Sequence, residues 1–522
     1  MVTATLTNDN KWICLTSQND REICAIRDFF TKKIPNWFII RQKNPHINIE
    51  ECFVNGYNMI PVGLWVELIR AAKKFGLDIN FVDNFNERIT DNSITTDSIN
   101  DYISHLYEKS TMKPKDYQTD AVCKVLRYKK CCIEVSTSGG KTFISYMIFR
   151  YMIDVLGIKH ILFVTPKTNL TTQSADKWLS YDEANGIETT WTHAEIHASA
   201  KKKKVYDDTI VFGNYQSLCK KNQDFFNMFD AIIIDECHHS TAKSIINITK
   251  RCANAQYKLG MTGTFPKDDT HESYVLQSYL GPVVYRLSSS DLIYRENFAT
   301  PVYVTSIELK YLPESQLKKL YNVRLNKPSN DSSAGGKIYN AEKELARADE
   351  TRFNFICDMI SKTTKNTLVI FSDIKTGYGS KVYNRIKDTT RKHVYYIDGC
   401  TPVNARETII SEMESDTDGN TILIASMGCF SEGIDIGNLW NIFLIETTKS
   451  DTMIAQLLGR GMRRFKGKDK TIMIDFVDDY RYGDGRYSEN YLYRHGKERV
   501  SIYKKRGFPL SAISLDLRSK TF

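Results

Sequence analysis

The sequence predicts an α/β protein built on doubly wound parallel sheets, and three short apolar runs predict it. Residues 131–135 form an apolar, partly β-branched run that is followed by small residues and then by the apolar-rich segment 143–156. Ala231–Ile234 is apolar throughout and ends at Asp235, and Thr367–Phe371 is a third such run. Short apolar runs closed by polar residues are typical of parallel strands covered on both faces, whose carboxyl ends carry functional side chains.

The segment between the first run and its helix has the character of a phosphate-binding loop. It is small and flexible and ends in Lys-Thr. Such a loop directs backbone N–H groups at an anion, and the helix N-terminus adds partial positive charge. Lys141 can reach the β and γ phosphates, and the Thr142 hydroxyl suits Mg²⁺. The general pattern has glycine where Val135 stands, and a simple Gly-Gly turn before a helix is the alternative. The nucleotide-binding residues expected here are Thr137, Ser138, Gly139, Gly140, Lys141 and Thr142.

Two carboxylates follow the run Ala231–Ile234. We expect Asp235 to hold Mg²⁺ and Glu236 to orient or deprotonate the attacking water, since phosphoryl transfer needs mainly positioning and charge neutralisation. An exposed turn after a strand is the alternative for an isolated pair. The neighbouring 237–239 stretch, Cys-His-His, has no cysteine pair at zinc-like spacing, so we expect no metal ligation there.

Two arginines far downstream, Arg460 and Arg463, are three residues apart and would share a helix face. We expect both to point across a cleft at the γ-phosphate. Arginine fingers raise phosphoryl-transfer rates by roughly 10³–10⁵. Lys466, Lys468 and Lys470 follow, and we expect them to be solvated surface.

The order of these segments resembles that of the superfamily 2 helicases. Asp116-Tyr117-Gln118 is similar to their Q motif, the phosphate loop to motif I, and residues 235–238 to motif II. Thr262-Gly263-Thr264 resembles motif III, and residues 456–464 resemble motif VI. Members of this superfamily often lack the upstream glycine, so Val135 fits, whereas Ser138 replaces one of their glycines.

The resemblance implies two tandem RecA-like doubly wound domains with a small N-terminal α+β accessory domain, and hydrolysis of ATP with Mg²⁺. Thr367–Ser372 resembles motif IV and residues 431–435 resemble motif V. Further nucleotide contacts are implied for Tyr117, Gln118, Gly433, Asp435 and Gln456. Coupling between nucleotide state and domain movement is implied for Thr262, Gly263 and Thr264. Nucleic-acid contacts are implied for Thr165, Pro166, Lys167, Asn214, Ser372 and Ser431.

Four regions follow from this plan. An accessory nucleic-acid-binding domain is expected in residues 1–110, the two motor domains in 111–300 and 301–475, and a basic aromatic extension packed on the second motor domain in 476–522. Local patterns predict a strand around residues 37–40, a helix over 64–75 capped by Gly76, a linker over 83–100 and an exposed loop over 326–336.

Two further segments resemble phage recombination and branch-migration DNA helicases. They are residues 58–64, before a basic-ended helix, and residues 490–496. This resemblance implies unwinding and branch migration of forks, Holliday junctions and R-loops with 3′-to-5′ polarity, in recombination, replication and repair. The implied partners are branched or forked DNA and RNA–DNA hybrids.

Charge and composition agree with a nucleic-acid partner. The chain carries a net charge of +9, and residues 481–522 hold ten Lys/Arg against four Asp/Glu, a net charge of +6. Lys504, Lys505 and Arg506 are expected to contact phosphates, and the six aromatic residues between 482 and 508 either stack on bases or pack the tail onto the second domain. The four lysines 201–204 are more typical of a solvated loop.

The remaining composition predicts a globular, cytoplasmic protein, which would be in the host cell cytoplasm if a phage encodes it. Of the 522 residues 42% are hydrophobic, no apolar run approaches the ~18 residues of a membrane span, and no signal peptide is visible. Twelve cysteines without paired spacing fit reduced thiols.

Three other functions compete with a DNA helicase. A DEAD-box RNA helicase shares the fold, but its Asp-Glu-Ala-Asp and Ser-Ala-Thr signatures are absent from the sequence. A restriction-type translocase would share the motor and track duplex DNA without separating strands. A non-enzymatic DNA-binding scaffold with a decayed motor is disfavoured because Lys141, Asp235, Glu236, Arg460 and Arg463 are all present.

Overall fold

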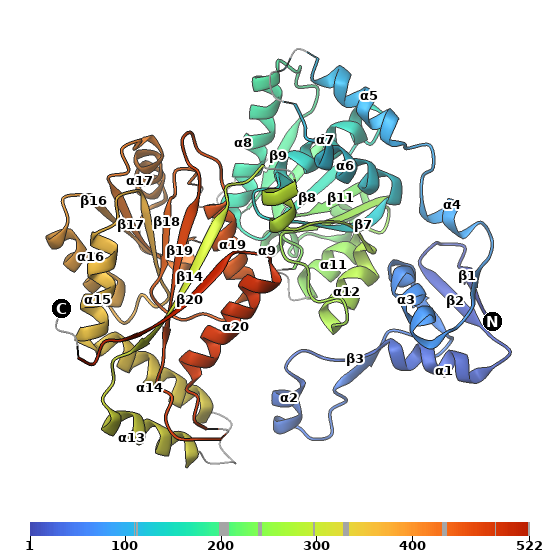
Figure 1. The fold of residues 1–522 in the computed structure, drawn as a ribbon. Helices are drawn as coiled ribbons and strands as arrows, with labels where there is room; N and C mark the ends of the chain where they lie inside the picture. Colours follow the sequence, from blue (N-terminus) through green and yellow to red (C-terminus); the bar gives the residue numbers. More distant parts are fainter. Residues whose placement is uncertain are drawn as a thin grey trace. The chain divides into compact units, whose positions relative to one another are not determined.

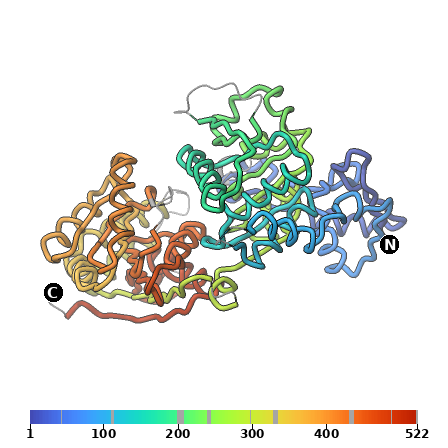
Figure 2. Tube along the Cα trace, turned by 90° about the horizontal axis from the view of Figure 1, so that it is seen from above, coloured from blue at the N-terminus to red at the C-terminus, as the bar shows by residue number. Residues whose placement is uncertain are grey.

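The computed structural model folds into two compact units, Met1–Leu287 and Ser288–Phe522 (Figures 1 and 2). The structure describes residues 1–108, 110, 113–197, 208–238, 243–295, 298–326, 334–430, 436–485 and 487–519. Within these residues no helix is both long and apolar enough to cross a membrane.

The first unit begins with a small α+β region. Its four-stranded sheet has the order β5-β2-β1-β6, and β3 and β4 form a separate two-stranded antiparallel sheet. The strands are β1 (Val2–Leu6), β2 (Trp12–Thr16), β3 (Thr31–Lys33), β4 (Glu50–Cys52), β5 (Met59–Pro61) and β6 (Ile79–Phe81). The helices are α1 (Asp20–Phe29), α2 (Trp37–Lys43), the 3₁₀ turn η1 (Val62–Leu64), α3 (Trp65–Phe75), α4 (Phe85–Ile89) and α5 (Thr96–Leu106).

Two local predictions in this region are wrong and one is confirmed. Residues 37–40 belong to helix α2, entered through Asn36 in the left-handed conformation (φ 56°), because a short apolar run cannot by itself distinguish strand from helix. The expected linker 83–100 contains α4 and the start of α5, whose Thr95–Ser98 capping box was the signal for a helix. Helix α3 ends as predicted, at Gly76 in the left-handed conformation.

The rest of the first unit is a seven-stranded parallel sheet of order β13-β7-β12-β11-β8-β10-β9. The strands are β7 (Lys130–Val135), β8 (Ile161–Thr165), β9 (His193–Ile196), β10 (Ile210–Asn214), β11 (Ala231–Ile234), β12 (Tyr257–Thr262) and β13 (Val283–Leu287). The helices are α6 (Asp116–Tyr128), α7 (Lys141–Asp154), α8 (Thr168–Asn185), α9 (Tyr215–Leu218), α10 (Gln223–Asn227), α11 (Lys243–Arg251) and α12 (His271–Leu280). The strand, loop and helix predicted over 131–156 are therefore confirmed.

The small N-terminal region shares a hydrophobic core with the large sheet's helix α12. Tyr274 and Val275 of α12 are buried among Phe30, Phe53 and other apolar side chains of the N-terminal region. Gly63 permits this packing, because a Cβ there would lie 1.9 Å from the backbone oxygen of Gln277. The two parts of the first unit are thus one packed body.

The second unit holds another seven-stranded parallel sheet, of order β16-β17-β15-β18-β19-β14-β20. The strands are β14 (Val302–Lys310), β15 (Thr367–Phe371), β16 (His393–Ile397), β17 (Thr421–Ser426), β18 (Asn441–Leu444), β19 (Thr471–Asp478) and β20 (Leu510–Asp516). The helices are the π-helix η2 (Asp291–Arg295), α13 (Glu314–Leu325), α14 (Ala334–Ala348), α15 (Glu350–Ser361), α16 (Tyr378–Thr389), α17 (Val403–Ser415), α18 (Met427–Phe430), α19 (Asp451–Gly461) and α20 (Tyr491–Lys505). The predicted class, two RecA-like doubly wound sheets with a small N-terminal α+β region, is confirmed.

The C-terminal segment is part of this second sheet. Strand β20 pairs in parallel with β14, and the two run side by side in both views (Figures 1 and 2). Helix α20 contributes Leu492 to the core, together with side chains from α14, α15 and α16. Of the loop predicted over 326–336, residues 334–336 are instead the first turn of α14, and 327–333 lie outside the described residues.

Candidate nucleotide and nucleic-acid site

The strand order of the first sheet separates two groups of predicted site residues. The neighbouring strands β7, β12 and β11 end at the phosphate loop, at Thr262 and at Asp235. The next two strands, β8 and β10, end at Thr165 and Asn214. Because all seven strands are parallel, these ends lie along one edge of the sheet, which is where doubly wound folds bind ligands.

The phosphate loop between β7 and α7 is a strained turn supported by the helix before it. Ser138 (φ 73°) and Gly140 (φ 78°) are both left-handed, a conformation that favours glycine. The amide of Gln118 packs against Gly140, where a Cβ would lie 2.4 Å from Gln118 Nε2. Gln118 is also anchored, because its Oε1 accepts the N–H of Lys115 at 3.0 Å. Tyr117, beside it on α6, is buried.

Lys141 at the first turn of α7 faces the acidic residues that follow β11. Its Nζ lies 3.4 Å from Oε1 of Glu236, and both side chains are only partly exposed. Gly263 approaches the same lysine, since a Cβ there would lie 3.3 Å from Lys141 Nζ and 3.4 Å from Thr137 Oγ1. Three predicted motifs therefore meet at one ammonium group.

Asp235 and Glu236 form the acidic part of the site. Burial and the adjacent Glu236 carboxylate raise the pKa of Asp235, while Lys141 opposes the shift. The Thr142 hydroxyl makes no hydrogen bond to another described residue. Carboxylate and hydroxyl oxygens are donors that Mg²⁺ prefers, and a crowded acidic pair gains stability from a cation, so these residues fit the ion. Among the described residues no group of three or more His, Cys, Asp or Glu side chains has the arrangement of a protein-only metal site.

The hydroxyl of Thr262 connects the acidic residues to the loop after β12. It lies 3.4 Å from Glu236 Oε2, accepts the N–H of Thr264 at 3.0 Å and contacts Nδ1 of His238. Thr262 is fully buried. The Thr264 hydroxyl, in contrast, is buried and hydrogen-bonds to no residue that the structure describes.

The predicted nucleic-acid residues of the first unit lie together. Thr165 and Asn214 are aligned across β8 and β10, and both are buried. The Thr165 hydroxyl shares a hydrogen bond with Thr171 at 2.8 Å, and Asn214 donates to Thr168 at 2.7 Å. These bonds fix the turns that present their backbone, together with Pro166 and Lys167, at the sheet edge.

In the second unit, helix α19 carries Gln456 and Arg460 but ends before Arg463. The helix stops at Gly461, so the two arginines do not share a helix face as predicted, and Arg463 lies in the turn beyond, with its N–H bonded to the Arg460 oxygen. Burial lowers the pKa of Arg460 to about 10 and that of Arg463 to about 10, so both remain charged at neutral pH. Buried cations are costly unless an anion compensates them.

Lys468 is not the solvated lysine that the sequence predicted. Its Nζ donates to the backbone oxygens of Gly461 at 2.8 Å and Arg463 at 2.9 Å. Gly461 ends α19 and Arg463 lies in the turn beyond it, so the helix itself leaves these two carbonyls unpaired. Lys468 thereby holds the turn that carries Arg463, whereas Lys466 and Lys470 are exposed.

Other predicted residues of the second unit have distinct surroundings. Ser372, at the end of β15, donates its N–H at 2.6 Å and its hydroxyl at 3.0 Å to Glu446, a residue that sequence reasoning missed although it follows the buried strand β18. Lys504 and Lys505 are exposed, while Arg506 pairs with Asp451 at 2.6 Å. Ser431, Gly433 and Asp435 lie outside the described residues, as do the lysines 201–204.

Two family models match the motor region in the order in which the two sheets occur. The first, described as "Type III restriction enzyme, res subunit", matches residues 111–267. The second, "Helicase conserved C-terminal domain", matches residues 351–465. These two matches agree with the phosphate loop, the acidic pair and the two arginines at the end of α19. The chain therefore belongs to the superfamily 2 helicases and is an ATP-dependent enzyme acting on nucleic acid.

Within this superfamily the chain is similar to the ATP-dependent DNA helicase UvsW of Enterobacteria phage T4. The two are 26% identical over 471 residues, which cover 87% of each chain. The "DNA 3'-5' translocase XPB2" of Sulfurisphaera tokodaii is 26% identical over 413 residues, covering 72% of this chain and 84% of that protein. Among solved structures, the DNA-bound restriction-modification enzyme LlaBIII shares the fold with a TM-score of 0.54 at 18% identity, over 79% of this chain and 32% of that one.

Proposed function

We propose that this helicase uses ATP and Mg²⁺ to unwind and branch-migrate branched DNA, including forks, Holliday junctions and R-loops, with 3′-to-5′ polarity. The observation that carries the chemical part of this proposal is the contact between Lys141 and Glu236 at 3.4 Å. The hydroxyl of Thr262 contacts the same Glu236 carboxylate. One set of side chains can thus sense a bound phosphate and pass its presence to the loop after β12.

Each residue of the first unit has a separate role in this proposal. The backbone of residues 136–140 and the Lys141 ammonium bind the β and γ phosphates. Glu236 orients the attacking water and accepts its proton. Gln118, held against Gly140, supports the loop from behind. Asp235 and Thr142 would hold Mg²⁺, which when bound neutralises developing charge on the phosphates.

The second unit supplies cations. We propose that Arg460 and Arg463 stabilise the charge of the transferred γ-phosphoryl group and that Gln456 contacts the nucleotide. Burial supports this role, because a charged guanidinium held out of water gains most from an anionic ligand. Gly433 and Asp435 are proposed for the nucleotide, and Ser431 for the nucleic-acid backbone, from their motif alone.

The choice of branched DNA rests on similarity. The relation to UvsW covers 87% of both chains, which is more than the motor alone and so includes at least part of the N-terminal region. The name of the translocase XPB2 supports the 3′-to-5′ direction. We propose that the first unit contacts one strand through Thr165, Pro166, Lys167 and Asn214, and that the second does so through Ser372.

One assay with a panel of substrates tests this function. ATP hydrolysis and strand displacement are measured with linear single strands, linear duplex, forks, four-way junctions and R-loops, each with DNA or RNA strands. The expected result is hydrolysis stimulated most by branched DNA and displacement of forked strands only with ATP. Stimulation by RNA duplexes alone, or hydrolysis indifferent to every nucleic acid, would contradict the proposal.

A translocase that tracks duplex DNA is the second candidate. The match of residues 111–267 to a restriction-enzyme subunit and the relation to XPB2 favour it. Such a motor displaces a third strand from a triplex without separating the duplex. Triplex displacement in the absence of fork unwinding would therefore select this second function.

A further inference from the structure

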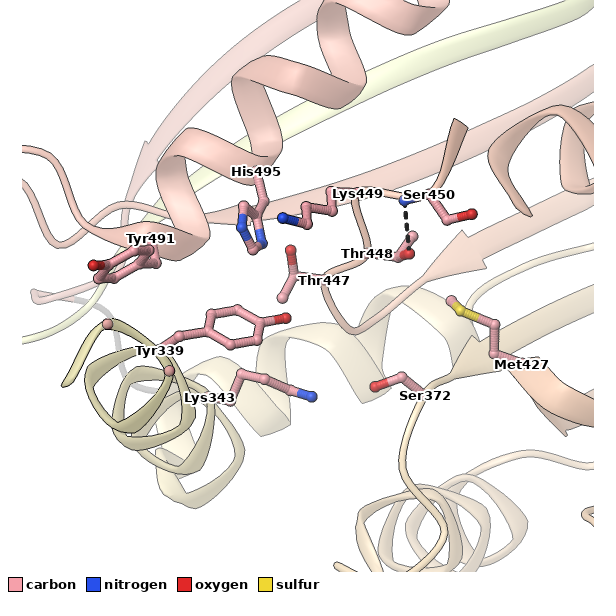
Figure 3. Close-up of a pocket in the computed structure, with 12 residues that line it drawn as sticks. Tyr339, Lys343, Ser372, Met427, Thr447, Thr448, Lys449, Ser450, Tyr491 and His495 are labelled. Atoms are coloured by element: carbon pink, nitrogen blue, oxygen red, sulfur yellow. Dashed lines mark hydrogen bonds between the residues drawn. The ribbon is translucent and has the colours of Figure 1, made fainter. Parts of the chain in front are cut away.

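A cavity of about 670 Å³ lies wholly within the second unit, beside the strand ends that carry Ser372 and Glu446. Its walls come from helix α14, from the turn after β18 and from helix α20 (Figure 3). Twelve residues of the described part of the chain line it, and none of these twelve is acidic. No role predicted from the sequence used this cavity, although it contains Ser372 from the predicted nucleic-acid set.

One wall of the cavity is aromatic. The rings of Tyr339 and His495 have centroids 4.9 Å apart, and Tyr491 is 6.4 Å from Tyr339 in an edge-on arrangement. In Figure 3 the Tyr339 ring and the His495 ring face the space between α14 and α20. His495 Nδ1 hydrogen-bonds to no residue in the described part of the chain. The wall therefore offers flat ring surfaces, while the Nδ1 atom itself is buried.

Two lysines give the cavity positive charge. Lys343 lies over the Tyr339 ring at 5.6 Å, and Lys449 is exposed and forms no ion pair with a carboxylate that the structure describes. Burial and the cations Lys449, Arg499, Arg494 and Lys343 lower the pKa of His495 to about 4. The imidazole is thus neutral at pH 7 in a positive environment, which suits stacking of a base beside an anion.

We propose that this cavity binds one nucleotide of a single-stranded nucleic acid, with the base against Tyr339 and His495 and a phosphate near Lys343 and Lys449. The inference rests on the helicase function and adds to it a base-holding site whose aromatic rings and lysines lie outside the superfamily motifs. Aromatic rings combined with lysines bind unpaired bases without sequence preference. A paired base cannot enter such a cavity, because its faces are stacked within the duplex.

The site would hold the unwound strand by its bases, whereas the motif residues act on the backbone. Ser372 lies on the wall opposite the rings and is fixed by Glu446. A strand that passes Ser372 can therefore place its next base in the cavity. Threonines 447 and 448 add hydroxyl groups between the two walls.

The chain offers matched control residues for a test. Tyr339 and Tyr383 are both half-buried helix tyrosines packed on the same core, and only Tyr339 lines the cavity. Lys343 and Lys387 each lie 5.6 Å over such a tyrosine, and only Lys343 lines the cavity. The test compares Tyr339→Leu with Tyr383→Leu and Lys343→Ala with Lys387→Ala, and adds Lys449→Ala.

Binding of a fluorescent oligo-dT strand is measured by anisotropy over a range of salt concentrations. Tyr339→Leu should weaken binding about fivefold or more, the effect of losing one stacked base, while Tyr383→Leu should not. Lys343→Ala and Lys449→Ala should each reduce the log–log salt slope by about 0.7. Oligo-dT containing 5-bromodeoxyuridine should photo-crosslink to peptides carrying Tyr339 or Tyr491 in the full-length chain.

The outcomes separate this inference from the proposed function. In one outcome the wild-type protein binds the strand and shows DNA-stimulated ATP hydrolysis, but Tyr339→Leu and Lys343→Ala match their controls and no cross-link forms in the cavity. That outcome would overturn the inference and leave the proposed function standing. Absence of both binding and stimulation in the wild type would remove the proposed function and the inference with it. Hydrolysis without DNA should be equal in all five variants.

Discussion

The hydroxyl of Thr262 lies 3.4 Å from Oε2 of Glu236, so the residue expected to act on water is in direct contact with the loop that follows β12. The same hydroxyl accepts the N–H of Thr264 and contacts His238. A hydroxyl has one proton to donate, so any change at Glu236 on nucleotide binding or hydrolysis must redistribute these bonds. This gives the predicted coupling motif a physical basis.

Thr262→Val should separate hydrolysis from unwinding. Valine fills the same buried volume but removes the hydroxyl. We expect strand displacement to fall about 5- to 150-fold, the usual range of coupling energies, while ATP hydrolysis falls less than about fivefold. Both rates are measured on a forked duplex.

Thr264→Val is the control for this change. Its hydroxyl is buried with no hydrogen bond among the described residues, so its replacement by a methyl group should leave both rates nearly unchanged. Parallel losses of hydrolysis and unwinding in a folded Thr262→Val protein would argue against coupling through this hydroxyl.

Lys141→Ala and Glu236→Gln should both abolish nucleic-acid-stimulated hydrolysis, for different reasons. The first removes a phosphate-neutralising charge and should lower kcat by about 10²-fold or more and weaken nucleotide binding. The second keeps the shape but removes the base, so kcat should fall about 10²- to 10⁴-fold with binding retained. Calorimetric titration with a non-hydrolysable nucleotide measures binding, and near-wild-type turnover in either variant would refute the site.

The phosphate loop contains a paired prediction about strain. Ser138 has φ 73°, a left-handed conformation that costs a non-glycine residue about 1–2 kcal/mol, whereas glycine pays about 0.4–1 kcal/mol in unfolded-state entropy. Ser138→Gly should therefore raise stability by up to about 1 kcal/mol and keep nucleotide affinity. Gly140→Ala should displace Gln118 and weaken nucleotide binding. Thermal unfolding with and without nucleotide distinguishes them, and a destabilised Ser138→Gly would mean that the serine side chain supports the loop.

The features of this chain that sequence could predict are those with a local cause. The helix end at Gly76 and the strand, loop and helix around Lys141 follow from neighbouring residues and are found as predicted. The helix over residues 37–43 was not predicted. Its apolar side chains are poorly buried, Phe38 being 58% exposed, so the sequence does not show the apolar and polar faces of a helix packed on a core. Its period is too short to settle helix against strand.

Features created by contacts distant in sequence could not be predicted. Lys468 resembles its exposed neighbours in sequence, yet it caps α19 because the chain returns there. The tail's aromatic residues divide in the same way. Tyr503 is buried and bonded to Asp475, Phe508 is buried, and Tyr491 lines the cavity of the second unit. Packing therefore explains some of these rings, and the open face of Tyr491 is revealed only by the fold.

The basic tail should contact DNA through two residues instead of three. Arg506 is paired with Asp451 at 2.6 Å, so reversing its charge would also disturb the start of α19. Lys504→Glu with Lys505→Glu avoids that ion pair and should weaken DNA binding regardless of sequence, with a salt slope reduced by about 0.7–0.9 per lost contact. Lys466→Glu with Lys470→Glu is the control, because both of these lysines are exposed as well. Identical slopes for the two double variants would show that the tail lysines are only solvated surface.

Gly63→Ala should loosen the N-terminal region from the motor of the first unit. The added Cβ would lie 1.9 Å from the backbone oxygen of Gln277, and backbone at that distance cannot yield as a flexible side chain would. We expect a loss of about 1–3 kcal/mol, seen as a lower Tm by about 2–4 °C per kcal/mol. Gly56→Ala is the matched control, because a Cβ there meets nothing within 4 Å.

Gly63→Ala also tests the role of the N-terminal region better than deletion of residues 1–110. The deletion would expose Tyr274 and Val275 of α12 and destabilise the motor itself. If the N-terminal region serves junction processing, Gly63→Ala should impair the unwinding of four-way junctions more than it impairs ATP hydrolysis stimulated by single strands. Equal effects on the two activities would mean that the region has only a structural role.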